Sequence, residues 1–447
     1  MSQEEVAGQR EEGKGAVRLR RAERRQMAMV VHCPDDLVGS EHEVRMVAAV
    51  VARLDLSGFQ TAIRAREGMA GRDATDPELL VSLWLYGCVR GIGSARELAR
   101  RCEESAPFRW LCGGVTVNHR LLSDFRTDHE AALDELFTQL LASLVDKGLV
   151  KVSRMSQDGV RIRVSAGASS FRREERLQSL LEQAREQVEQ LRQQLESPAQ
   201  MAGVSARKKA ARKRAAKEKQ ERLESAIQQL PELKQKREQA ASRAGQGKCG
   251  QKLREKELRV STSDAEARRM KMPNGGYNPA VNVQLASDTA SRAILGVAVS
   301  NEGSDSAHLS EPMRQQVEQR TKGKIQQHLL DGGYLRMEDL ERAHQQDVEL
   351  FVPPKPARTQ QNRGQELEPK AKDSEAVKAW KDRMRSEEGK QIYKERASTS
   401  ETVNAELRTC RGLTQITVRG LGKIKCVALW CALAYNVMHL GSAWLQT

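Results

Sequence analysis

Aromatic residues are scarce in this chain. Phe, Trp and Tyr together make up 4% of its 447 residues, and all hydrophobic types together make up 39%. The length allows two or three domains, but so little apolar material favours sizeable solvated segments beside the packed cores. The eight cysteines include no C-x-x-C pair and no accompanying histidine spacing. This pattern argues against a zinc module and a disulfide framework, and it is typical of a reducing compartment.

Long apolar runs are also missing. The longest, Cys426 to Leu440, has about fifteen residues and contains Asn436 and His439. It is too short and too polar to span a bilayer, so we expect a buried helix there. The first 25 residues are charged throughout and lack the apolar segment of a secretion signal. We therefore expect a cytoplasmic protein that makes no membrane contact.

The charge balance is strongly basic. Lys and Arg total 74 against 60 Asp and Glu, which gives a net charge of +14 and a pI near 9.5. Such a balance favours a polyanionic partner such as nucleic acid, although a merely basic soluble protein has the same composition. How the cations are distributed along the chain decides between these two interpretations.

The N-terminal third is predicted to be helical. Residues 1–35 lack the apolar residues that would offset the entropy of ordering, so we expect a disordered basic arm there. In residues 36–148, Asp76-Pro77-Glu78 marks a helix start and Ser94-Ala-Arg-Glu97 is a capping box. These helices suit a DNA-binding or docking domain, although any small helical domain has basic faces. The arginines that they present are Arg96, Arg100, Arg101, Arg109, Arg120 and Arg126.

Residues 172–259 are predicted to form a basic antiparallel coiled-coil insertion. Leucines and other apolar residues recur from Leu177 to Leu195 at spacings of four and three, and a second helical segment runs from Leu223 to Leu233. Pro231 must kink or interrupt this return helix. Clustered cations near the tip suit nucleic-acid contact, although a charge run is usually a solvated face and the arm could instead serve self-association. These cations are Arg207, Lys208, Lys209, Arg212, Lys213 and Arg214.

Two acidic turns adjoin predicted strands. Val160, Ile162 and Val164 alternate with polar residues, which places Asp158 at a strand end, and Asp331-Gly-Gly333 ends a short apolar strand. An isolated Asp-Gly is most often only a turn. Carboxylates at adjoining strand ends, however, could hold Mg²⁺ together with substrate phosphate oxygens. Two such ions about 4 Å apart would support a phosphodiester displacement, so a metal-dependent phosphodiester enzyme is one interpretation.

Several short sequence motifs, or words, occur together in this chain. They are Gln157-Asp-Gly-Val-Arg-Ile-Arg-Val-Ser-Ala-Gly-Ala-Ser-Ser-Phe-Arg172, Ser261-Thr-Ser-Asp-Ala-Glu-Ala-Arg-Arg-Met-Lys271, Gly275-Gly-Tyr-Asn-Pro-Ala-Val-Asn-Val-Gln284, Asp331-Gly-Gly-Tyr334 and Tyr393-Lys-Glu-Arg-Ala-Ser-Thr-Ser-Glu-Thr-Val-Asn-Ala405. Together these words resemble bacterial insertion-sequence transposases of the DDE type, from about residue 40 to the C-terminus. The N-terminal helical region is similar to the InsH type within that group.

The resemblance implies a fold. It is an α/β RNase H-like catalytic domain with a mixed sheet flanked by helices, formed by residues 149–171 and 260–447. The all-α domain precedes it and the coiled-coil insertion interrupts it. A polar excursion is expected within it at 353–390.

The resemblance also implies an activity and its residues. Asp158, Asp331 and Glu401 would hold two Mg²⁺ ions, with Mn²⁺ as a substitute, for DNA cleavage and strand transfer. The Tyr-Arg-Glu-Lys signature of the family maps to Tyr393, Arg396, Glu401 and Arg408, which places Tyr393, Arg396 and Arg408 on DNA. Arg408 stands where Lys is usual, and one extra residue separates Arg396 from Glu401. The implied partner is double-stranded DNA, both element ends and target, bound by a homodimer at the nucleoid, with no small-molecule substrate.

Alternatives stay open at this point. Glu401 could merely cap its helix through Ser398-Thr-Ser-Glu401, and Glu395 and Glu406 compete for the role of third acid. The whole chain could be a non-catalytic DNA-binding or architectural protein, or a decayed transposase relative. A basic coiled-coil scaffold would leave the acids of the two turns unexplained. Convergence of the three carboxylates is the geometric observation that separates an enzyme from the other two classes.

Overall fold

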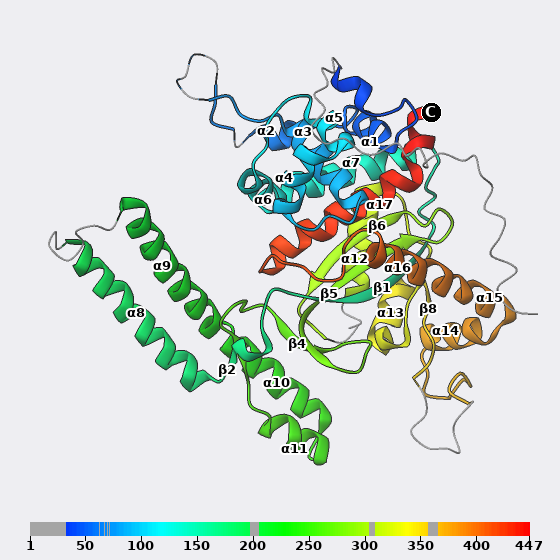
Figure 1. Ribbon diagram of the computed structural model, residues 1–447. Coiled ribbons are helices and arrows are strands. Elements are labelled where there is room, and N and C mark those ends of the chain that lie inside the picture. Colours follow the sequence, from blue (N-terminus) through cyan, green and yellow to red (C-terminus); the bar gives the residue numbers. More distant parts are fainter. Residues whose placement is uncertain are drawn as a thin grey trace, which may run out of the picture.

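The structure is a computed structural model, and it describes residues 33–61, 63–66, 68, 70, 72–196, 205–303, 309–355 and 365–447. The basic arm expected at 1–35 therefore lies almost entirely outside the described residues. Figure 1 shows a block of helices above a curved sheet and a long helical hairpin that projects from one side of it.

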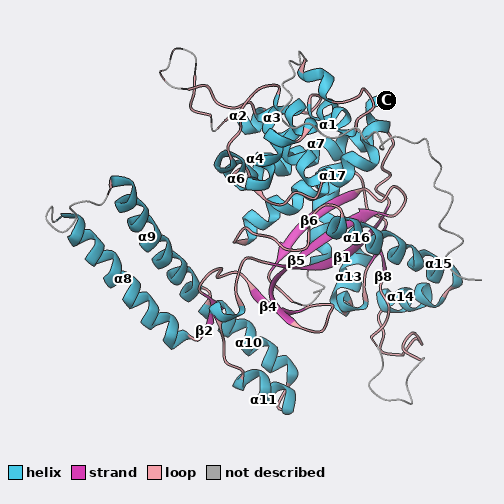
Figure 2. Ribbon diagram, viewed as in Figure 1, coloured by secondary structure: helices cyan, strands magenta, loops and turns pink. Residues whose placement is uncertain are grey.

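A mixed sheet forms the centre of the molecule (Figure 2). Its strands follow the order β4-β5-β1-β7-β8, and β6 pairs with β5. β5 is antiparallel to β1, whereas β1, β7 and β8 are mutually parallel. The strands are β1 Arg154–Arg163, β4 Arg268–Lys271, β5 Tyr277–Asp288, β6 Ile294–Ser300, β7 Gln327–Leu329 and β8 Glu349–Phe351. β5 and β6 form an antiparallel hairpin.

The N-terminal helices begin where the sequence predicts. Asp76 accepts a hydrogen bond from the backbone N–H of Glu78 at the start of α3, and Ser94 accepts one from Glu97 at the start of α4. The elements of this region are η1 Pro34–Leu37, α1 Glu43–Val51, α2 Ser57–Gln60, α3 Pro77–Val89, α4 Ala95–Glu104, α5 Ala106–Cys112, α6 His119–Thr127 and α7 Glu130–Asp146.

The C-terminal helix α17 (Leu421–Gln446) joins these helices to the sheet. It packs against α3, α7 and β6, and its apolar residues belong to the same hydrophobic core as those of the N-terminal helices. By length and composition α17 could cross a membrane, but 72% of its apolar window is buried inside the protein. Buried Asn436 explains the polar residue in this run, because its amide exchanges two 2.8 Å hydrogen bonds with the backbone of Ile294 in β6. The prediction of a buried helix is confirmed.

The insertion is a helical hairpin on a short two-stranded base. β2 (Phe171–Arg172) pairs with β3 (Val260–Ser261), and between them run α8 Glu174–Glu196, α9 Ala206–Gln228, α10 Leu230–Ala244 and α11 Lys248–Glu255. Leu177, Leu181 and Leu223 are buried together between α8 and α9. Pro231 lies in the first turn of α10, so the predicted interruption of the return helix is confirmed.

The segment after β8 is more ordered than its composition indicates. The polar excursion expected at 353–390 contains α14 (Glu375–Arg385), and α15 (Glu387–Arg396) also begins within it. Val377, Trp380 and Met384 are buried against β8 and α13 (Met337–Gln345), with which they form a second hydrophobic core. The expectation is wrong for this half of the segment, because spacings of three and four give α14 an apolar face. The remaining helices are α12 Ser310–Thr321, η5 Gly332–Tyr334, η7 Ala397–Glu401 and α16 Thr402–Thr409.

Candidate active site

The register of two parallel strands brings Asp158 and Asp331 side by side. Ser156 of β1 pairs with Leu329, the last residue of β7. Because parallel strands advance together, two further residues along each chain lead to Asp158 and Asp331. Asp331 follows the end of β7 and begins η5. The sheet therefore sets the two carboxylates next to each other.

Asp158 does not lie at a strand end, as its Asp-Gly sequence suggested. It lies in the middle of β1, where it is the register partner of Leu285 in β5. Gly159 continues the strand opposite Gln284, so the turn interpretation is also wrong. The prediction failed because the strand pairing with β5 overrides the local turn preference of Asp-Gly. The Asp158 side chain is 21% exposed and that of Asp331 is 51% exposed, so solvent reaches both.

The guanidinium of Arg396 lies between the two carboxylates. Its Nη2 is 3.9 Å from Oδ1 of Asp158 and 3.6 Å from Oδ1 of Asp331. The Arg396 side chain is 13% exposed, and its Nε is buried without a hydrogen-bond partner among the described residues. One cation thus offsets the repulsion between two adjacent anions, at distances too long for strong hydrogen bonds.

Tyr393 lies one turn before Arg396 on α15 and faces the same acids. Burial raises the pKa of the Tyr393 phenol, the Arg396 charge opposes this rise, and the charges of Asp331 and Asp158 add to it. Those electrostatic effects require that the phenol lie near both aspartates. Two residues that the sequence assigned to the signature are therefore gathered at the Asp158–Asp331 pair.

The helix that carries these residues contains a turn of π-helix. α15, η7 and α16 follow one another without a break from Glu387 to Thr409, and η7 is the π-helical part. A π turn closes its hydrogen bonds over five residues instead of four, so it absorbs one extra residue without turning the following side chains away. The additional residue between Arg396 and Glu401 is accommodated here. A buried 2.6 Å hydrogen bond between the hydroxyls of Ser156 and Ser400 fixes this turn to β1.

Glu401 is exposed at the end of the π turn and does not join the aspartates. Its carboxylate makes no hydrogen bond or ion pair with another described residue, and it does not cap a helix. Among the residues that the structure describes, no group of three or more His, Cys, Asp or Glu side chains could hold a metal ion. The expected convergence of three carboxylates is thus seen for two of them only.

The two competing glutamates are engaged elsewhere. Both carboxylate oxygens of Glu395 accept 2.7 Å hydrogen bonds from Arg154. Glu406 pairs with Arg411 at 2.6 Å and with His439 at 2.8 Å. Of the three candidates on this helix, Glu401 is the one whose carboxylate remains available for another ligand.

Asn404 is a site residue that the sequence reasoning missed. Its Nδ2 donates a 3.1 Å hydrogen bond to Oδ2 of Asp158. It lies one turn after Glu401, and residues three apart share a helix face. This spacing within the word Glu401-Thr-Val-Asn404 was the available signal, but only the packing of α16 against the sheet shows its target.

Two parts of the chain match models of known protein families. Residues 32–128 match the model of a transposase domain, DUF772, and residues 353–441 match that of a transposase DDE domain. The second match contains Tyr393, Arg396, Glu401 and Arg408, whereas Asp158 and Asp331 lie outside both. These two matches support an insertion-sequence transposase of the DDE type. Searches of curated proteins and of solved structures found no match.

The donor set of this transposase suits a divalent metal only in part. Adjacent Asp oxygens that solvent reaches are the ligands that Mg²⁺ prefers, and a cation already lies between them. The third carboxylate is absent from the cluster. Asp158 and Asp331 therefore fit a metal ion, while Glu401 must reorient to reach it.

The other predicted DNA contacts lie on separate surfaces of the transposase. Arg408 is exposed on α16, and the six hairpin cations lie in the first turns of α9, where all are exposed except the half-buried Lys209. Arg126 cannot contact DNA as expected, because it is buried against the Trp84 ring at 4.7 Å and donates to the carbonyl of Gly93.

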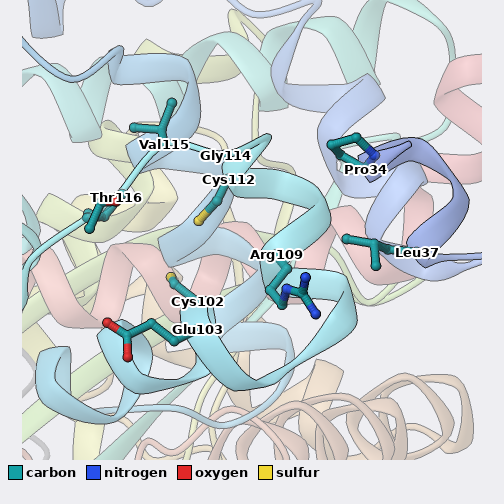
Figure 3. Close-up of a pocket in the computed structure, with 10 residues that line it drawn as sticks. Pro34, Leu37, Cys102, Glu103, Arg109, Cys112, Gly114, Val115 and Thr116 are labelled. Carbon is teal, nitrogen blue, oxygen red and sulfur yellow. The ribbon is translucent and has the colours of Figure 1, made fainter. Parts of the chain in front are cut away.

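A pocket of about 240 Å³ lies in the N-terminal helices, between η1 and the end of α5 (Figure 3). Cys102 and Cys112 point toward each other in its wall. A hydrogen bond with Cys112 and burial both raise the pKa of the Cys102 thiol. None of the aspartates of the candidate active site lines this pocket.

Proposed function

We propose that this transposase binds the ends of an insertion sequence and catalyses Mg²⁺-dependent DNA cleavage and strand transfer at the Asp158–Asp331 pair. The observation that supports the proposal most is the parallel register, which places two carboxylates side by side with the signature residue Arg396 between them. The order β6-β5-β1-β7-β8, with β5 antiparallel to its neighbours, supports an RNase H-like sheet.

Each residue of the site has a distinct role in this proposal. Asp158 and Asp331 would hold Mg²⁺ or Mn²⁺, with Glu401 as the third ligand. Bound metal supplies activation of the attacking oxygen and stabilisation of the leaving oxygen. Water and a 3′-hydroxyl are interchangeable nucleophiles for in-line attack at phosphorus, so one site serves both cleavage and joining.

The cations of the site act on the DNA backbone. Arg396, whose planar guanidinium lies near both carboxylates, would pair with a phosphate of the DNA. Tyr393 lies beside it, and Arg408 lies two turns after Glu401 on the same helix face. The hairpin cations add contacts away from the site, and a homodimer at the nucleoid would bring two element ends together.

One observation favours a second candidate function. The described residues contain no three-ligand cluster, and an arginine lies between the two aspartates. In a decayed relative that binds DNA as an architectural protein without cutting it, Arg396 would always remain between the two aspartates. The two candidates differ in whether Mg²⁺ displaces Arg396.

The test is cleavage by an Asp158→Asn variant. Because the amide keeps the size of the side chain but removes its charge, we expect Mg²⁺-dependent cleavage of element-end DNA to be lost while DNA binding is retained. Asp382→Asn, an exposed aspartate on α14 outside the site, is the matched control and should cut normally. Full cleavage by Asp158→Asn would overturn the assignment, and no cleavage by the wild-type protein would favour the architectural function.

A further inference from the structure

A groove of about 830 Å³ is lined in part by residues that follow Asp331 closely in sequence. One wall contains Leu335 and Arg336, which directly follow the η5 turn that Asp331 begins. The opposite wall contains Pro354 and Lys355, which follow β8. Gly332 approaches Pro353 so closely that a Cβ at Gly332 would lie 3.4 Å from its ring. On the first wall, the lining thus begins four residues after Asp331 in sequence, at Leu335.

The insertion supplies a further wall of this groove. Arg243, in the last turn of α10, lines it together with residues of the catalytic part of the chain. The α8–α9 hairpin projects to one side of the sheet (Figure 1), whereas the last turn of α10 lines the groove. The groove is thus built from three separate parts of the sequence.

Three basic side chains of the groove form no ion pair with a described residue. They are Arg243, Arg336 and Lys355, and each comes from a different wall. Lys381 is also present, but its 2.6 Å ion pair with Asp373 neutralises it. The lining also contains Lys370 and three acids, Glu338, Glu366 and Asp373, so its cations outnumber its acids by five to three.

Apolar side chains lie between these cations. Met337 is 50% exposed, an unusual position for a large hydrophobic residue, and Leu335, Val377 and Trp380 lie in the floor. Cations that reach phosphates, combined with apolar surface against which sugars and bases can pack, are typical of sites for single-stranded nucleic acid. A membrane headgroup or a small anion would use the charges but not this extended floor.

We propose that this groove binds one DNA strand as it leaves the Asp158–Asp331 pair, with phosphates at Arg243 and Arg336 and a sugar or base against Met337. The proposal rests on the proposed function, because it takes DNA as the substrate of the neighbouring site. It gives α10 a role in holding DNA beside the site, separate from the cations at the far end of the hairpin.

The experiment measures DNA binding at several salt concentrations in EDTA, so that no cleavage occurs. The probe is a duplex of arbitrary sequence with a single-stranded 3′ extension, compared with a blunt duplex, and the read-out is fluorescence anisotropy. Each phosphate contact to a single strand contributes about 0.7 to the slope of log affinity against log salt. The double variant Arg243→Ala/Arg336→Ala should therefore lower this slope by about 1.4 on the extended probe and little on the blunt one.

The matched control is Arg385→Ala/Lys390→Ala, which removes the same charge from exposed positions of α14 and α15 outside the groove. It should bind like the wild type. A single Met337→Ser variant, at an exposed position, should weaken binding of the extended probe at every salt concentration without changing the slope. Thermal melting confirms that each variant is folded.

Two results would overturn the proposal: a wild-type salt slope for the double variant on the extended probe, or an equal fall of the slope in the control variant. Because the assay contains no metal, it is independent of cleavage. Cleavage by Asp158→Asn would refute the proposed catalytic role even if the groove binds DNA. Conversely, a wild-type salt slope in the double variant would refute the groove proposal even if Asp158→Asn loses cleavage.

Discussion

Asn404 donates a 3.1 Å hydrogen bond to Asp158, and this contact links the helix of the DDE domain match to the central strand of the sheet. Nearby, the hydroxyls of Ser400 and Ser156 form a second, buried contact between the same two elements. The signature helix is thus fixed to β1 by two bonds, one on each side of Glu401 in sequence. The position of Glu401 relative to Asp158 depends on both.

Replacement of Asn404 by Ala should impair metal binding without unfolding the protein. The substitution removes the group that orients Asp158, and loss of such a partner typically costs about 10–100-fold in metal affinity. Calorimetric titration of the protein with Mn²⁺ measures this effect directly. Thr402→Ala, on the same helix, is the control, because Thr402 bonds only to the backbone of Ser398. Equal Mn²⁺ affinity in Asn404→Ala and wild type would exclude this role.

Arg396→Ala should make the protein dependent on metal for stability. Without the guanidinium, the carboxylates of Asp158 and Asp331 repel each other until a metal ion lies between them. We expect a lower melting temperature than the wild type in EDTA, and a larger upward shift when Mg²⁺ is added. Cleavage should fall because a phosphate contact is lost. A Mg²⁺-induced shift no larger than that of the wild type would show that Arg396 does not occupy the metal position.

The Ser156–Ser400 bond should show strong coupling in a double-mutant cycle. Ser156→Ala leaves a buried hydroxyl on Ser400 without its partner, which costs about 1–3 kcal/mol. Removal of both hydroxyls should cost less than the sum of the single changes. Urea unfolding of the four proteins tests this. Strictly additive free energies of unfolding would mean that the bond does not hold the π turn in place.

Buried His328 should make the protein lose stability in mild acid. Burial and the nearby Arg314 charge hold the pKa of His328 well below its ordinary value of 6.5. The folded state therefore favours neutral His328, so its contribution is complete above about pH 6.5 and decreases as the pH falls below that value. His328→Gln, which cannot be protonated, should have a shallower dependence of its free energy of unfolding on pH between about 6.5 and 5. Parallel pH profiles for the two proteins would contradict this.

Much of the fold could be predicted because local signals agree with it. Asp76 and Ser94 cap their helices as expected, and the apolar run near the C-terminus forms the expected buried helix. The helix α14 was missed because its core residues Val377, Trp380 and Met384 are embedded in a charged segment. Their spacing of three and four residues is the signal in the sequence that predicts this helix.

The candidate site was less predictable because its geometry is set by pairing between distant segments. Asp158 lies within a strand only because β5 pairs along its whole length. The proximity of Asp331 follows from the β1–β7 register, and the role of Asn404 from the packing of α16. These contacts join segments that are far apart in the sequence, so no local pattern of residues predicts them. The family words located the two aspartates, but they did not indicate that Arg396 lies between them.

The most direct measurement of the central claim is Mn²⁺ binding to the protein without DNA, compared between the wild type, Asp331→Asn and Glu395→Gln. If Asp158 and Asp331 hold the metal together, Asp331→Asn loses binding. Glu395→Gln, whose carboxylate is paired with Arg154 instead, keeps it. Wild-type Mn²⁺ affinity in Asp331→Asn would contradict the account.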